Sequence, residues 1–116
     1  LGNFYQQWDI ILTPAFAKPT PLLGDKRYLT TSDNPDVLDW FYGLWDIFAY
    51  TPLASVTGTP GISLPLGHQQ SGIPLGIHAQ TRQGNDAQLL QLAAQLERAL
   101  GGRFGIGHQP MVHVTG

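Results

Sequence analysis

The feature that most constrains this chain is a stretch near its middle, residues 51–80, in which prolines and glycines recur every few positions. Proline lacks an amide hydrogen and glycine weakens regular structure, so a long helix or a central strand cannot run through the stretch uninterrupted. Two short apolar segments lie between these breakers, Ile62–Leu64 and Leu75–Ile77, and the residues between them are typical of a turn. The stretch therefore predicts two strands joined by a short loop, as in a β-hairpin.

The two predicted strands show no clear alternation of apolar and polar positions. A strand with one face in water alternates, whereas a strand that is covered on both sides does not. We therefore expect both strands to be apolar on both faces and to lie inside a larger sheet. Pro60, Pro65 and Pro74 cannot donate to a strand ladder, so they are expected at strand ends or at sheet edges.

The N-terminal third of the chain predicts a third strand and a long loop. Residues 9–14 indicate a strand, because consecutive apolar residues precede Pro14, while residues 1–8 favour the end of a helix. Residues 15–33 have no periodic pattern and predict a loop of a length that is uncommon in compact domains. With only about three strands, the chain cannot form a closed sheet by itself.

A helix is predicted before the hairpin, from about residue 35 to residue 49. Asn34 is a suitable N-cap, and Pro35 suits the first helical position. Apolar residues recur at helical spacing and further aromatic residues widen the stripe, so more than half of the helix circumference needs to be covered.

A second helix is predicted after the hairpin, over residues 86–100. Asn85 and Gln88 have the spacing of a capping box, and leucines form one apolar stripe. Gly101 and Gly102 favour the left-handed conformation that ends a helix. The tail that follows has no clear period.

Composition excludes several classes of function. A length of 116 residues fits one domain, and only 12% of the residues are charged, against roughly 25% in an average domain, so part of the surface is expected to meet protein. The net charge of −2 argues against nucleic-acid binding. No apolar run is long enough to span a membrane, and the first residues lack the pattern of a signal peptide. We therefore expect a cytoplasmic protein.

The residues offer no catalytic centre that can be recognised from spacing. There is no cysteine, and no two histidines have a helical metal-binding spacing. No serine lies in the Gly-x-Ser-x-Gly pattern, and Gly58–Gly61 lacks the lysine and the following helix of a phosphate loop. We therefore predict no catalytic residue, no metal site and no cofactor in this chain. The histidines, whose roles stay open, are His68, His78, His108 and His113.

Residues 57–65 (TGTPGISLP) and 72–77 (GIPLGI) resemble the C-terminal block of amidase-signature enzymes. In that family the block reads roughly Asn-x-x-Gly-x-Pro-Ala-(Ile or Val)-Ser-x-Pro, and then Gly-Leu-Pro-(Ile or Val)-Gly-(Ile or Val)-Gln. Residues 9–14 resemble the strand that precedes the block, and residues 86–97 resemble the last helix. Tyr50–Leu53 is most similar to the 6-aminohexanoate-cyclic-dimer hydrolase subgroup. Together these motifs cover roughly residues 4–100.

Three positions depart from the family pattern. Ser55 stands where asparagine is usual, Gly61 where alanine is usual, and His78 where glutamine is usual. These departures leave the local packing and the shape of the pocket open.

The resemblance implies an α/β fold in which residues 1–116 form the C-terminal portion of a single amidase domain. This portion of the mixed sheet, about three strands plus helices, is incomplete as an isolated domain. The family acts through a Ser–cis-Ser–Lys triad that lies well upstream of the matched block. The lysines of this chain, Lys18 and Lys26, lie in the early loop and no Gly-Gly-Ser-Ser-Gly segment is present, so no residue is carried over as catalytic.

Functions from different classes are open at this point. As part of an amidase acting on linear or cyclic amides, the segment would complete the sheet together with the remainder of the amidase chain and form part of the pocket for a small amide substrate. The 116 residues alone would then be inactive. The candidate pocket residues are Trp45, Tyr50, Ser55, Thr57 and Gly58. The alternative is a non-catalytic binding or assembly protein that keeps this architecture and self-associates. A third hypothesis is a small standalone ligand-binding domain with the aromatic helix as the wall of its pocket.

Overall fold

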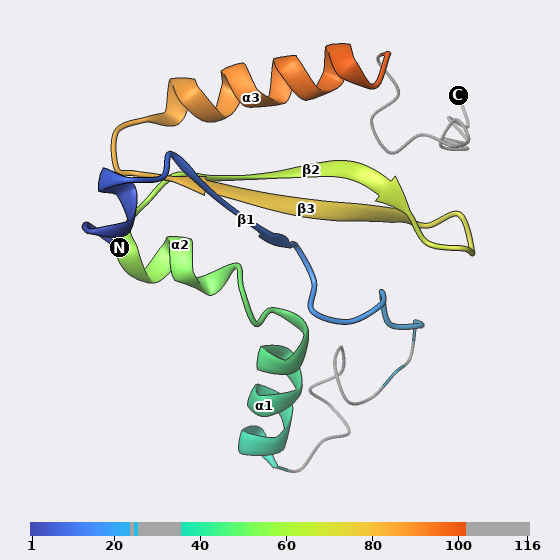
Figure 1. Ribbon diagram of the computed structural model, residues 1–116. Helices are drawn as coiled ribbons and strands as arrows, with labels where there is room; N and C mark the ends of the chain where they lie inside the picture. Colours follow the sequence, from blue (N-terminus) through green and yellow to red (C-terminus); the bar gives the residue numbers. More distant parts are fainter. Residues whose placement is uncertain (24, 26–35, 102–116) are drawn as a thin grey trace, which may run out of the picture.

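A computed structural model describes residues 1–23, 25 and 36–101 of the chain, and these form one small sheet with helices on both sides (Figure 1). The strands β1 (Ile10–Pro14), β2 (Gly61–His68) and β3 (Pro74–Thr81) pair antiparallel in the order β1-β3-β2. Helix α3 (Asp86–Ala99) lies along one face, and α2 (Pro52–Thr57) and α1 (Val37–Ile47) lie beyond the other. The α/β class and the three strands expected from the sequence are confirmed.

The predicted hairpin is confirmed as β2 and β3, although both strands are longer than their apolar centres. Gln69 and Ile73 close the connection through a backbone hydrogen bond of 2.8 Å, and Gly72 adopts a φ of 84° there. The three prolines lie where the sequence predicts. Pro60 precedes β2, Pro74 begins β3, and Pro65 lies at a bulge in β2, which is an edge strand of the described sheet.

The expectation that β2 and β3 are apolar on both faces is wrong. Their full length has an alternating pattern, which the three-residue apolar centres were too short to reveal. The face beneath α3 carries Ile62, Leu64, Ile77 and Ala79, and the opposite face carries Gly61, Ser63, Gly76, His78 and Gln80. We call this second set the small-polar face. It lies toward α2, since a Cβ built on Gly61 would be 3.4 Å from the Cβ of Ala54.

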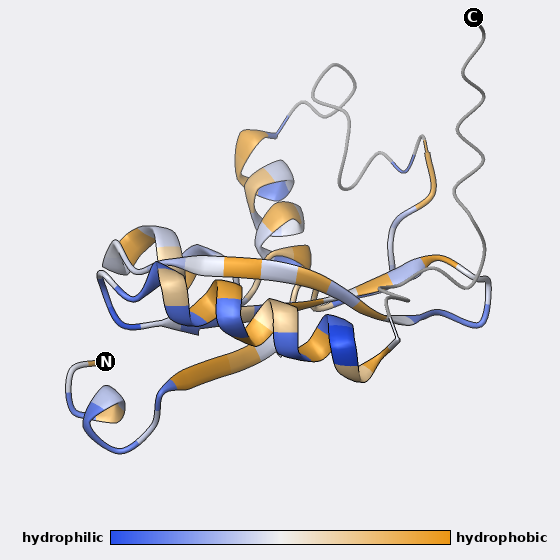
Figure 2. Cartoon of the chain, turned by 90° about the horizontal axis from the view of Figure 1, so that it is seen from above, coloured by the Kyte–Doolittle hydropathy of each residue, from blue (hydrophilic) through white to orange (hydrophobic). Residues whose placement is uncertain are grey.

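Helix α3 packs on β2 and β3 through its leucine stripe, with Leu89 buried against the sheet. The helix ends as predicted, and Gly101 follows it with a φ of 64°. α3 packs mainly on β2 and β3 rather than on β1. The strongly hydrophobic ribbon of β1 (Figure 2) includes Leu12, which is exposed.

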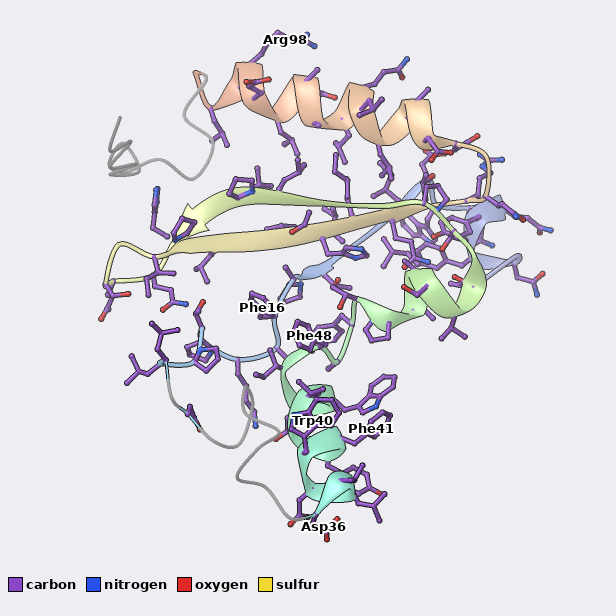
Figure 3. All side chains as sticks on the ribbon, turned by 180° about the vertical axis from the view of Figure 1, so that it is seen from behind. Phe16, Asp36, Trp40, Phe41, Phe48 and Arg98 are labelled. Carbon is purple, nitrogen blue, oxygen red and sulfur yellow. The ribbon has the colours of Figure 1, made fainter. Side chains whose placement is uncertain are left out.

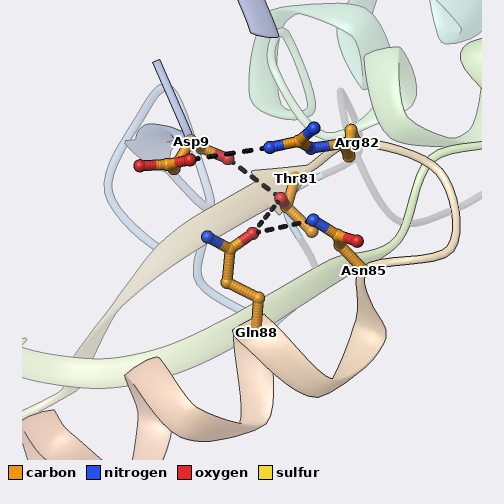
Figure 4. Close-up of polar contacts among 5 residues, drawn as sticks. All are labelled: Asp9, Thr81, Arg82, Asn85 and Gln88. Carbon is orange, nitrogen blue, oxygen red and sulfur yellow. Dashed lines mark hydrogen bonds and ion pairs between the residues drawn. The ribbon is translucent and has the colours of Figure 1, made fainter.

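The capping box predicted for α3 does not form. Asn85 occupies the N-cap position, but its side chain makes no capping bond, and its backbone N–H donates to the carbonyl of Arg82 over 3.2 Å. The side-chain oxygen of Gln88 instead accepts hydrogen bonds from the Thr81 hydroxyl at 2.8 Å and the Asn85 amide at 3.2 Å (Figure 4). Gln88 therefore ties α3 to the end of β3.

Thr81 is the centre of this polar cluster and is fully buried. Its hydroxyl oxygen lies 2.9 Å from the backbone oxygen of Asp9 and 2.8 Å from the side-chain oxygen of Gln88. A hydroxyl has one proton, so Thr81 donates to one of these acceptors at a time. The cluster joins the start of β1, the end of β3 and the first turn of α3, while Arg82 and Asp9 form an exposed ion pair at 3.7 Å.

Replacing Thr81 by valine should lower the free energy of unfolding by about 1–3 kcal/mol, because the buried hydroxyl that donates to the Asp9 carbonyl or to the Gln88 side chain is lost while the side chain keeps its shape. Urea denaturation followed by circular dichroism measures this change. Thr81→Ser is the comparison that keeps the hydroxyl. A valine variant within a few tenths of a kcal/mol of the unsubstituted protein would show that the cluster contributes little.

Helix α1 begins later than the sequence predicts. Asp36 is its N-cap and accepts a hydrogen bond from the backbone N–H of Leu38 at 2.8 Å, so the prediction that Asn34 caps the helix is wrong. Asn34 and Pro35 lie outside the described residues, as do Lys26, Arg27 and the tail from residue 102. An acceptor in an extended conformation just before the first turn satisfies N–H groups that would otherwise be unpaired.

Most of the apolar stripe of α1 is exposed. Ile47 is its one buried residue, whereas Val37, Leu38, Phe41 and Trp45 are exposed. This stripe is the surface of the helix that, from the sequence, should be covered by other parts of a protein.

Contacts with the segment after β1 hold the C-terminal end of α1. Ala17 donates a backbone hydrogen bond of 2.8 Å to Ile47, and Lys18 pairs with Asp46 at 2.6 Å. The rings of Phe16 and Phe48 meet edge to face with centroids 5.3 Å apart (Figure 3). The helix is thus anchored at one end.

Two short elements differ from the predictions. Residues 1–8 hold a single 3₁₀ turn, Phe4–Gln6, rather than the end of an α-helix. The segment from Thr51 to Pro60, for which the sequence analysis predicts no helix or strand, contains α2. Its signals were present in the sequence, because Pro52 begins the helix and Gly58 ends it with a φ of 64°.

Candidate functional site

A depression of about 500 Å³ lies between α1 and α2, and we call it the α1–α2 groove. Its lining is apolar except for two hydroxyl groups, and no charged side chain is among the residues that line it. The main contributors are Phe41, Trp45, Phe48, Pro52, Ser55 and Val56. Such a surface suits an uncharged, apolar group and offers one or two hydroxyls to orient it.

The local sequence explains how the groove forms. Phe41 and Trp45 lie one helical turn apart on α1, and their rings meet edge to face with centroids 5.8 Å apart. After α1 ends at Ile47, Pro52 starts α2 almost at once. Ala54 is the buried residue of α2, so Ser55 and Val56 are turned toward the groove.

The structure brings together two of the five pocket candidates proposed from the sequence. Trp45 and Ser55 both line the α1–α2 groove. Tyr50 is not among its lining residues and is exposed in the link between the helices, while Gly58 ends α2.

The fifth candidate, Thr57, lies on the other side of α2. Its hydroxyl donates to the carbonyl of Leu53 at 2.7 Å and lies 2.8 Å from the hydroxyl of Thr59. The amide nitrogen of buried Gln80 reaches both threonines, at 3.4 Å and 2.5 Å. Thr57 thus belongs to a polar contact between α2 and the sheet.

A second depression, of about 470 Å³, lies beside this contact and is lined in part by Thr57, Thr59, Tyr5 and Arg82. Burial raises the pKa of the Tyr5 hydroxyl, and the nearby Gln80 side chain lowers it by a smaller amount. The hydroxyl therefore stays protonated at neutral pH.

His78 belongs to the small-polar face, the side of the sheet that lies toward α2. The register sets His78 opposite Thr13 of β1 and Ser63 of β2, and only 8% of the residue is exposed. A Cβ built on Gly61 would lie 2.6 Å from the Nε2 atom of His78 and 3.4 Å from the Cβ of Ala54. The imidazole therefore occupies space that exists because residue 61 is glycine.

Burial lowers the pKa of His78 below its ordinary value of 6.5. The role of this histidine is open from the sequence alone, and its closeness to Gly61 is not predicted by any local pattern. The two residues are 17 positions apart in the chain, and they meet because the hairpin register aligns their side-chain positions on one face. The unusual residue types at both positions were the available signal.

Within the described ranges, no three histidine, aspartate or glutamate side chains come together in a way that could hold a metal ion. The same part of the chain includes no helix with the length and hydrophobicity needed to cross a membrane. His108 and His113 lie outside the described residues.

Comparisons with known proteins give a consistent picture. The sequence model of the family described as Amidase matches residues 1–90. The chain is 44% identical over 98 residues to "Putative amidase AmiC" of Mycobacterium leprae, covering 84% of this chain and 20% of that protein. It is 35% identical over 94 residues to the 6-aminohexanoate-cyclic-dimer hydrolase of Paenarthrobacter ureafaciens, covering 80% of this chain and 19% of that enzyme.

The structure is also similar to a solved one. It matches the structure of 6-aminohexanoate cyclic dimer hydrolase with a TM-score of 0.70 and 30% identity, covering 85% of this chain and 21% of that chain. The chain spans about a fifth of the length of the relatives that it matches. Because the family match extends over residues 1–90, the chain belongs to the amidase family.

Proposed function

We propose that this chain is the C-terminal part of an amidohydrolase that cleaves the C–N bond of a carboxamide through an acyl-enzyme. The observation that carries the proposal is the match of 85% of this chain to one fifth of the 6-aminohexanoate cyclic dimer hydrolase structure, with a TM-score of 0.70. The Ser–cis-Ser–Lys triad implied by the family resemblance would lie before residue 1. This segment would complete the sheet and one wall of the substrate pocket.

The α1–α2 groove is the proposed pocket wall, with Trp45 and Ser55 as its substrate contacts. Its lining supports a role in holding the uncharged, apolar part of an amide, since no charged side chain lines it. The partners of the segment are then the remainder of the amidase chain and a small amide substrate.

Replacing Val56 by arginine tests this role in the full-length protein. Val56 lines the groove and 81% of its surface is exposed in this structure, so the change places a charge in the groove without removing a core residue. We expect kcat/KM for an amide with a long apolar group to fall by about 10- to 200-fold, and much less for a two-carbon amide.

Leu90→Arg is the matched control, because Leu90 is also exposed but lies on α3, away from the groove. Equal losses for both amides in the Val56 variant, or an equal effect of the Leu90 change, would contradict a substrate role for the groove.

The 116 residues alone should hydrolyse no amide. Turnover that is abolished by a substitution within them would overturn the location proposed for the triad.

A non-catalytic assembly protein is the second candidate. The exposed apolar residues Leu38, Phe41 and Val56 favour it, because such a surface is normally covered by another chain or segment. Light scattering on the full-length protein separates the two readings. A protein that forms a defined oligomer, loses it in Leu38→Glu and hydrolyses no amide would support assembly over catalysis.

A further inference from the structure

We propose that His78 is a positioning residue that seats α2, and that protonation of His78 unseats the helix and weakens substrate binding in the α1–α2 groove. The inference rests on the function proposed above, because α2 supplies Pro52, Ser55 and Val56 to that groove. His78 itself does not line the groove.

The geometry of the contact carries the proposal. Ala54 is the one buried residue of α2, and His78 converges with it on the position where Gly61 has no side chain. A hydrogen bond of 3.1 Å from the Thr59 N–H to the Ala54 carbonyl ties α2 to the segment that leads into β2. A movement of the imidazole by a fraction of an ångström is therefore passed to the helix that forms one side of the groove.

The surroundings of His78 contain no counter-charge among the described residues. Of β1, β2, β3 and α2, only β2 contains another ionisable side chain, His68, which lies at its far end and is exposed. Tyr5, which lies beside Gln80 on the same face, is neutral because its hydroxyl pKa is raised. Past the strand ends, Asp9 and Arg82 pair with each other.

An imidazolium at this position would thus be partly desolvated and without a carboxylate. The structure can relieve that cost by admitting water, which requires α2 to lift from the sheet at Ala54. The stabilisation from neutral His78 is complete above pH 6.5, the ordinary value. It is lost as the pH falls through the lowered pKa of the folded state.

The test is the pH dependence of the full-length protein between pH 5 and pH 8. In the unsubstituted protein, KM for an apolar amide should rise as the pH falls toward 5, while kcat changes less. The rise is at most about tenfold for each pH unit by which the His78 pKa with α2 packed on the sheet lies below its pKa with α2 released. His78→Gln should have nearly constant KM. His68→Gln, the exposed control on the same hairpin, should behave as the unsubstituted protein does. An acid-side rise of KM that persists in His78→Gln would overturn the proposal.

A readout without catalysis keeps this inference separate from the proposed activity. In the full-length protein, the difference in emission between the unsubstituted protein and its Trp45→Phe variant reports on Trp45 in the groove. It should change with the same midpoint as the NMR titration of the His78 ring, and His78→Gln should abolish the change. Emission that is independent of pH would overturn the role of His78 whether or not an amide is hydrolysed.

A second variant tests the steric part of the contact. Gly61→Ala should disturb the Trp45 emission at every pH, because the new Cβ would lie 2.6 Å from the His78 Nε2 atom. Adding His78→Gln should restore the emission, since a glutamine side chain can turn aside. A double variant as disturbed as Gly61→Ala would show that α2 is seated by other contacts.

Discussion

Replacing Leu89 by alanine is expected to lower the free energy of unfolding by about 2–5 kcal/mol, the largest effect of any single truncation considered in this chain. Leu89 is 3% exposed and lies on the side of α3 that packs on the sheet. Its removal leaves a cavity where α3 covers the central strand β3, and the surrounding backbone can collapse into that space only in part.

Leu90 provides the matched control for this experiment. It is the next residue of the same helix, has the same side chain, and is 65% exposed. Leu90→Ala should change stability by no more than about 0.5 kcal/mol, and both variants should keep the urea dependence of the unsubstituted protein. Equal losses from the two substitutions would show that α3 does not pack on the sheet through Leu89.

Replacing Gly76 by alanine is expected to cost about 1–3 kcal/mol, through crowding rather than through a cavity. A Cβ built on Gly76 would lie 2.9 Å from the Cβ of Ala15 and 3.2 Å from the Ser63 hydroxyl. The Ala15 N–H donates a hydrogen bond of 2.9 Å to the Gly76 carbonyl, so the two strands cannot separate without weakening it.

Two comparisons make the Gly76 prediction specific. Ala15→Gly removes the opposing methyl group, so the double variant should recover most of the stability lost in Gly76→Ala. Gly67→Ala should be tolerated, because its new Cβ would be 3.7 Å from the nearest atom, the Cβ of Leu75. A double variant as unstable as Gly76→Ala, or an equal cost at Gly67, would contradict crowding against Ala15.

The contact between Ala15 and Gly76 also bears on the candidate site. Two residues after Ala15, the Ala17 N–H donates to Ile47 and holds the end of α1. A shift of Ala15 away from β3 would therefore move the anchor of α1 and one wall of the groove. We expect Gly76→Ala to alter the Trp45 emission as well as the stability.

Local signals predicted most of the elements, and tertiary contacts decided where the predictions failed. The hairpin, the strand ending at Pro14 and the helix over residues 86–99 follow from breakers and apolar spacing. Gln88 has the spacing of a capping-box residue, but the buried Thr81 hydroxyl takes its side chain. No local pattern contains that competitor, because Thr81 belongs to another element.

The candidate site divides in the same way. Trp45 and Ser55 could be chosen from the sequence because aromatic and small residues flank a run of breakers. They meet in one groove because α2 forms between Pro52 and its C-cap Gly58, and the sequence analysis predicts no helix there. Thr57 is close to Ser55 in the chain, but it lies at the end of α2, where its side chain is directed to the sheet instead.

The sequence by itself determined that the stretch of residues 51–80 contains a hairpin bounded by prolines and glycines, because these residues restrict or free the backbone at their own positions. It also determined the family, because the ordered motifs lie within this stretch and beside it. Only the tertiary structure decided that Gly61 and His78, two departures from the family pattern, share one space. Side-chain neighbours across a sheet are set by strand register and by what packs on each face, and neither is written in local spacing.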